Sequence, residues 1–164
     1  MEMPLNILFW GMEAAYLIHC LDETIAGDGF VNMVKKHFWS EYNIKKFFWF
    51  NTGFHLINVF AIILYEILGR DWVIFPLTIS WIFVTNGFWH VFGTIMFKEY
   101  SPGLITSPLY WMIMYFIIRY NFLQGDISLS NFVISIIIGS VVTILMIGSL
   151  FAKRWLQMRQ NPTK

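Results

Sequence analysis

The chain has 164 residues, of which 57% are hydrophobic, 20% aromatic and only 13% charged. A soluble domain carries about 25% charged residues, so this composition excludes an ordinary soluble globule and indicates an integral membrane protein. The formal net charge of +1, from 11 basic and 10 acidic residues, provides no basic field for nucleic acid. The single cysteine, Cys20, excludes a disulfide within the chain.

Five apolar stretches approach the roughly 20 residues that a helix needs to cross a bilayer. They cover residues 4–26, 47–68, 72–97, 104–121 and 132–152. The first lacks a basic leading region and carries Glu13 and His19, so we interpret it as a retained helix rather than a cleaved signal. The sequence therefore predicts one all-α membrane domain over residues 1–164, a polytopic bundle of about five transmembrane helices.

The segment between the first two predicted spans has a different pattern. Residues 30–46 mix aromatic and aliphatic side chains with Lys35, Lys36, Lys45 and Lys46. This mixture is typical of an amphipathic helix lying in the headgroup plane. We therefore expect an interfacial helix over residues 30–46.

The basic residues predict an orientation in the membrane. All 11 except Arg70 and Arg119 lie in segment 30–46, at Lys98 or after residue 152, and a bundle of five spans brings these three places to one face. Cytoplasmic loops are enriched in lysine and arginine. We expect an N-terminus outside and a C-terminus in the cytoplasm, in a protein of the plasma membrane.

Polar side chains recur inside the predicted spans, although a charged group at the membrane centre costs roughly 2.5 to 3.5 kcal/mol on insertion scales. They are His19, Asp22 and Glu23 in the first span, Asn51, His55 and Asn58 in the second, and Asn86 and His90 in the third, with Thr106 shortly after. Spacings of three or four residues place each set on one helical face. The predicted topology puts the three histidines at similar depths near the cytoplasmic side.

Three neutral imidazoles and a carboxylate from different helices form a ligand set of zinc or non-haem iron. We therefore predict a divalent metal ion, zinc in preference to iron, bound by His19, His55, His90 and Glu23. Asp22 is predicted to be a further ligand or a general base, so Asp22 and Glu23 are the candidate catalytic carboxylates. The residues expected to orient ligands or substrate are Glu13, Asn51, Asn58, Asn86, Tyr100 and Thr106.

Part of this pattern follows an order known from other chains. The segment His19-Cys20-Leu21-Asp22-Glu23 is followed by His90 and by the turn Tyr100-Ser101-Pro102-Gly103. Over residues 17–108 the chain resembles the HXXEE membrane protein family, which has a His-x-x-Glu-Glu motif, a later histidine and a Tyr-x-Pro-Gly element. Asp22 replaces the first glutamate and keeps a carboxylate on a shorter side chain. The resemblance implies that these residues belong together, and it implies no reaction, because the family is uncharacterised.

These features predict a metal-dependent membrane enzyme that acts on a lipid-like or otherwise membrane-borne substrate. Zinc hydrolysis is favoured over iron oxygenation, because the chain has only four histidines and lacks the paired Glu-x-x-His helices of di-iron bundles. The alternative is a small transporter or proton-relay protein that uses the same polar cluster. The expected partners are membrane lipid and the substrate. The small residues Gly139, Ser140, Gly148 and Ser149 indicate close packing of the last span, either within the bundle or between two copies of the chain in a homo-oligomer.

Overall fold

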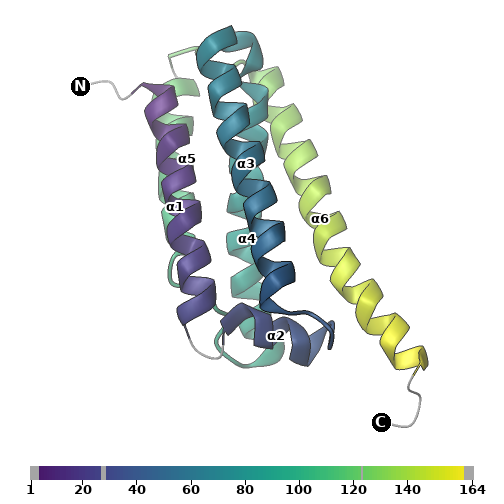
Figure 1. The fold of residues 1–164 in the computed structure, drawn as a ribbon. Helices are drawn as coiled ribbons and strands as arrows, with labels where there is room; N and C mark the ends of the chain where they lie inside the picture. Colours follow the sequence, from purple (N-terminus) through teal and green to yellow (C-terminus); the bar gives the residue numbers. More distant parts are fainter. Residues whose placement is uncertain (1–3, 27–28, 123, 161–164) are drawn as a thin grey trace.

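The computed structural model describes residues 4–26, 29–122 and 124–160. Over these ranges the chain forms helices and turns and no strand, which confirms the all-α prediction. The α-helices are α1 (Leu5–Ile25), α2 (Gly29–His37), α3 (Ile44–Leu68), α4 (Ile74–Phe97), α5 (Ser107–Phe116) and α6 (Leu129–Gln160). A 3₁₀ turn, η1 (Arg70–Trp72), precedes α4, and a π-helix, η2 (Ile117–Phe122), continues α5. The short α2 lies across one end of the bundle of long helices (Figure 1).

Three helical segments are long and apolar enough to cross a membrane, Ile44–Leu68, Arg70–Phe97 and Leu129–Gln160. They correspond to the second, third and fifth predicted spans and fit a membrane protein. Helix α1 has 21 residues but carries three carboxylates, and α5 has ten residues before the π-helix begins. Five crossings are therefore not established, and the first and fourth remain predictions.

The connector after α1 differs from the predicted interfacial helix. Helix α2 ends at His37, and α3 begins at Ile44, three residues earlier than the predicted second span. Asn43 explains this start, because its side-chain oxygen accepts a hydrogen bond from the backbone N–H of Lys46 at 3.0 Å and so caps the helix. Lys45 and Lys46 consequently lie in the first turn of α3.

The last two helices also differ in length from their predicted spans. Helix α5 begins at Ser107 rather than at residue 104, since the chain turns up to Thr106 and Pro108 lies in the first helical turn, where proline is well tolerated. Helix α6 extends from Leu129 to Gln160 and includes Lys153, Arg154 and Arg159, which follow the predicted span.

Helix α4 is the centre of the bundle and packs against α1, α3, α5 and α6. Its apolar face, which includes Leu77 and Phe83, is buried with Phe9 and Met12 of α1 and Tyr110 of α5. Helices α3 and α6 instead expose many large apolar side chains, as expected of surfaces that face lipid. The buried core thus places the facing sides of α1 and α4 next to each other.

Glu99 ties α2 to the turn that follows α4. Its two carboxylate oxygens accept hydrogen bonds from Lys36 and His37 at the end of α2. The hydrogen bonds from Lys36 and then His37 hold the pKa of the Glu99 carboxyl below its usual value, since they favour the ionised form. This contact is therefore retained above the ordinary carboxyl pKa and weakens as the pH falls through the lower value.

Helix α6 packs on α4 through a row of small residues, Ser135, Gly139 and Thr143, all buried. The hydroxyl of Thr143 lies 2.6 Å from that of Thr85 on α4. A Cβ atom at Gly139 would lie 2.8 Å from Cβ of Trp81 and 3.0 Å from the carbonyl oxygen of Thr78. Small residues allow this close approach of two membrane helices, whereas Gly148 has open space around it.

Replacing Gly139 by alanine is expected to lower the free energy of unfolding by about 1–3 kcal/mol. The added methyl group would meet a Cβ atom and a backbone oxygen, which cannot rotate away. The midpoint of thermal unfolding in detergent measures the effect. Gly148→Ala on the same helix is the control and leaves the midpoint unchanged or slightly raised, because alanine favours the helix and meets no neighbour there. Equal midpoints for the two variants would contradict this packing.

Candidate functional site

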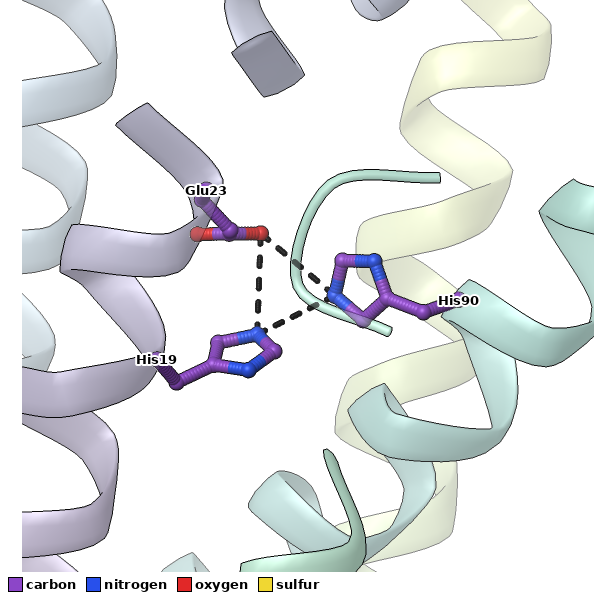
Figure 2. A group of neighbouring side chains, drawn as sticks. All are labelled: His19, Glu23 and His90. Atoms are coloured by element: carbon purple, nitrogen blue, oxygen red, sulfur yellow. Dashed lines mark hydrogen bonds and ion pairs between the residues drawn. The ribbon is translucent and has the colours of Figure 1, made fainter. Parts of the chain in front are cut away.

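His19 and Glu23 of α1 and His90 of α4 point toward one another in the interior of the bundle (Figure 2). The Nε2 atoms of the two histidines lie 3.1 Å apart. Glu23 Oε1 lies 3.4 Å from Nε2 of His90 and 3.7 Å from Nε2 of His19. One ligand atom from each residue lies within 4.8 Å of the other two, so the group is compact enough for all three to reach a single ion.

Helical spacing explains how α1 and α4 form this group. His19 and Glu23 are four residues apart and therefore project from one face of α1. Asn86 stands one turn before His90 on α4, and its Nδ2 lies 3.2 Å from Nε2 of both histidines. The amide can therefore donate to both imidazoles from the side of α4.

The loop between α4 and α5 holds the other nitrogen of each imidazole. Nδ1 of His19 lies 2.9 Å from Oγ1 of Thr106, and Nδ1 of His90 lies 3.1 Å from Oγ of Ser101. The Thr106 hydroxyl donates to Asp22 at 3.0 Å, and the Ser101 hydroxyl donates to Met33 Sδ at 3.4 Å. Hydroxyls whose protons are used in this way suit imidazoles protonated at Nδ1, a tautomer that would direct the Nε2 lone pairs into the group.

Gly103 allows this loop to cross both imidazole rings. Its φ is +99°, in a region that favours glycine. A Cβ atom there would lie 2.7 Å from Cε1 of both His19 and His90. The glycine is therefore required both by the backbone conformation and by the close approach to the two rings.

Asp22 lies outside the group of three. Its Oδ2 accepts hydrogen bonds from the backbone N–H and the hydroxyl of Thr106, at 3.2 and 3.0 Å. Tyr100 donates to its Oδ1 at 3.5 Å. Burial and the nearby Asp22 carboxylate raise the pKa of the Tyr100 phenol, which keeps it a donor. The structure thus connects Asp22 to His19 through Thr106, rather than placing it among the predicted ligands.

His55, the remaining predicted ligand, belongs to a different polar group. Its Nδ1 is hydrogen-bonded to Glu13, whose other oxygen accepts from Asn58 Nδ2 at 2.5 Å. Because α3 begins at Ile44, His55 lies about 16 Å along it, level with Glu13, about 18 Å from the end of α1, whereas His19 is about 9 Å from that end. The structure therefore brings together three of the four predicted ligands and leaves His55 a level deeper.

Three further residues surround the group. Asn51, predicted to orient a ligand, instead accepts a hydrogen bond from the Tyr16 hydroxyl at 2.7 Å. The ring of Tyr110 lies 5.0 Å from that of His19, and its buried hydroxyl has no hydrogen-bond partner among the residues that the structure describes. No sequence pattern predicts Tyr110 at this site, although Tyr110 lies one helical turn after Thr106.

A cavity of about 290 Å³ adjoins the group. His19, Glu23 and Asn86 contribute to its wall, and most of its other lining residues are aromatic or aliphatic side chains of α1, α3, α4 and α6. Ligand pockets are mostly apolar with a few polar groups in place. The arrangement therefore suits a largely apolar ligand with a reactive or polar end.

Residues 10–118 match the family described as protein of unknown function with HXXEE motif. This chain belongs to the HXXEE family. No curated protein and no solved structure matches the chain. In this HXXEE protein the motif histidine and the second acidic residue contact the later histidine, the first acidic residue holds Thr106, and Gly103 covers the two rings. The resemblance seen in the sequence is confirmed.

Gly103→Ala is expected to destabilise the protein more than Gly69→Ala. Both glycines have positive φ, so both substitutions introduce backbone strain of roughly 1–3 kcal/mol. Only Gly103 among the two also has atoms within 4 Å of the added methyl, since Gly69 has open space around it. Thermal unfolding of both variants in detergent separates the two effects. A Gly103→Ala midpoint at or above that of Gly69→Ala would contradict the close approach to the imidazoles.

Proposed function

We propose that this HXXEE protein is a metal-dependent membrane enzyme that hydrolyses a lipid-like substrate, with zinc bound by His19, His90 and Glu23. The observation that carries the proposal is the convergence of two Nε2 atoms and a carboxylate oxygen within 4.8 Å in a buried site. Lone pairs directed at one point repel one another unless a proton or a cation lies between them. Asn86 supplies hydrogen bonds to the two nitrogens, and the group still has the composition of a cation site.

The residues present fit a catalytic zinc centre better than a structural one. Catalytic zinc has three protein ligands, two histidines and a glutamate in one common set, and one open position. Ligating imidazoles donate their other N–H to a neighbouring acceptor, as Thr106 and Ser101 allow here. Two histidines and one carboxylate also bind iron in oxygenases, so the metal analysis below distinguishes the two reaction classes.

The proposed chemistry divides between metal and chain. A zinc ion would act as a Lewis acid on a carbonyl or phosphoryl group of the substrate. Hydrolysis consumes one water, whose hydroxyl joins one fragment and whose proton joins the other. Thr106 and Ser101 would hold the imidazoles in the ligating tautomer, and Asp22 accepts a hydrogen bond from the Thr106 hydroxyl and so positions His19. The adjoining apolar cavity supports a membrane-borne substrate.

The proposed membrane topology has five crossings, with the N-terminus outside and the C-terminus in the cytoplasm of a plasma-membrane protein. Helix α1 has 21 residues and is thus about 31 Å long, which matches the hydrocarbon thickness. The bias of lysine and arginine toward one face supports the orientation. The site would then open toward the cytoplasmic leaflet.

Elemental analysis of the purified protein tests the metal centre. The wild type is expected to carry about one zinc per chain, and His90→Ala and Glu23→Gln are expected to lose it, because each removes one of three ligands. His55→Ala is the matched control and keeps the metal, since His55 is bound to Glu13. A folded wild type without metal would sink the proposal, and stoichiometric iron would change hydrolysis to oxygen chemistry.

A second candidate function, proton relay or proton-coupled transport, is favoured by one specific observation. Glu13 is buried at a deeper level of the bundle with His55 and Asn58, and intramembrane carboxylates paired with histidine commonly carry protons. The side chain of His55 is 35% exposed, so the pair is not sealed inside the protein.

The relay makes a prediction of its own. Proteoliposomes containing the protein should dissipate an imposed pH gradient faster than empty liposomes, and Glu13→Gln should abolish the difference. Glu66→Gln is the control. It removes a carboxylate at the end of α3, where Glu66 accepts a hydrogen bond from Trp10, outside the group of Glu13, His55 and Asn58. Liposomes that hold the gradient as well as empty ones would exclude the relay and leave the enzyme.

A further inference from the structure

The cavity beside the three-residue group continues away from it between α3 and α6. Its walls there are Phe50 and Phe54 of α3 and Met146, Ile147 and Leu150 of α6. Helix α6 packs mainly on α4, and α3 packs on α1 and α4. The two helices diverge toward the end of the bundle that carries α2 (Figure 1). This part of the cavity is therefore bounded by two helices that expose apolar side chains on their outer faces.

Two lysines lie at the α2 end of this cavity. Lys46 lines the cavity, and its Nζ is 4.3 Å from the centre of the Trp39 ring. Lys153 of α6 approaches the same indole, with its Nζ at 4.9 Å. The carboxylates that form ion pairs in the described ranges bind other partners. Lys46 Nζ also donates to the carbonyl oxygen of Glu41 at 2.7 Å. The two ammonium groups beside one indole, outside those ion pairs, thus place positive charge at the α2 end of the cavity.

The polar and apolar parts of the cavity follow one another in depth. Lys46 lies in the first turn of α3, and Phe54 lies about 12 Å deeper. On α1, Glu23 and His19 precede Tyr16 in the same direction, and all three contribute to the cavity wall. The positive charge therefore lies toward the α2 end, with the group of three deeper, and apolar side chains line the whole depth, including Trp39 and Tyr42 near Lys46.

The volume bears on how much of a lipid enters. Ligand pockets range from about 300 to 1,000 Å³, and this cavity of about 290 Å³ lies at the small end of that range. Its size therefore favours a lipid with one alkyl chain over a lipid with two. Lysine binds phosphate as a point charge. An anionic head group at the opening would thus complement the charge there while its chain covers the apolar wall.

We propose that this cavity binds an anionic lipid, with a phosphate head group at Lys46 and Lys153 and one alkyl chain between α3 and α6. The bonds that join head group to chain then lie opposite His19 and Glu23. This inference rests on the proposed function for the role of those bonds, and it deepens that proposal by naming the substrate class.

Lipid binding to the full chain, purified in detergent, tests the inference through native mass spectrometry. The probes are lysophosphatidate and a monoacylglycerol with the same acyl chain, which differ in the phosphate. The wild type should bind lysophosphatidate more tightly. Replacing both Lys46 and Lys153 by glutamine should weaken that binding roughly 10- to 30-fold, since each basic residue contributes about a factor of five, and should leave monoacylglycerol binding unchanged.

Matched control variants distinguish lipid binding at the cavity from lipid binding elsewhere on the protein surface. Lys35→Gln with Lys45→Gln makes the same change in charge outside the cavity lining and should bind lysophosphatidate as the wild type does. Ile147→Trp fills the cavity and should reduce binding of both probes, whereas Leu145→Trp, at a position 67% exposed on the same helix, should reduce neither. Equal affinity for the two probes, an unaffected Lys46 and Lys153 variant, or wild-type binding by Ile147→Trp would each overturn the inference.

Metal content measured on the same preparations distinguishes this inference from the hydrolase. A wild type that holds no metal but binds lysophosphatidate through the two lysines supports the lipid site and defeats the hydrolase. A wild type that contains zinc but does not discriminate between the probes supports the metal centre and defeats the lipid site.

Discussion

The contact between the imidazoles of His19 and His90 is the interaction on which the rest of this protein is arranged. In hydrocarbon each buried polar atom needs a partner within the protein, and an imidazole has two nitrogens to satisfy. The two Nε2 atoms lie 3.1 Å apart, and the Asn86 amide of α4 can donate to both, which joins α1 to α4. Their remaining nitrogens must then be reached by side chains from elsewhere, and this requirement determines the course of the loop from Tyr100 to Thr106.

The loop meets the requirement through its sequence. Ser101 and Thr106 stand on either side of Gly103, so that each hydroxyl faces one ring while the glycine lies against both. Asp22 then extends the arrangement by binding Thr106. The HXXEE motif on α1 and the Tyr-x-Pro-Gly element after α4 therefore pack directly against each other.

Much of this organisation was predictable from the sequence, because it depends on composition and helical spacing. The low content of charged residues indicated a membrane protein, and the i, i+4 spacing of His19 and Glu23 indicated one shared face. A second span that begins at residue 47 predicts that His55 lies at the same depth in the membrane as these two residues. The Asn43 cap moves the start of α3 to Ile44, and the difference of one turn places His55 beside Glu13.

Other features depend on how the helices pack, which spacing along one helix does not determine. Tyr110 adjoins His19 because α5 is short and begins late, and the close approach of α6 to α4 depends on Gly139 rather than on Gly148. Which of several small residues lies in a contact depends on the rotation of the whole helix. The divergence of α6 from α3, and hence the cavity, follows from that same packing.

Ser101 and Thr106 lie on one loop, so a single displacement of that loop affects both histidines. Because Gly103 lies against both rings, a movement of the loop shifts the partners of both Nδ1 atoms at once. The positions of the two imidazoles are thus linked through the loop. A substitution that shifts the loop is expected to displace both rings together rather than one of them.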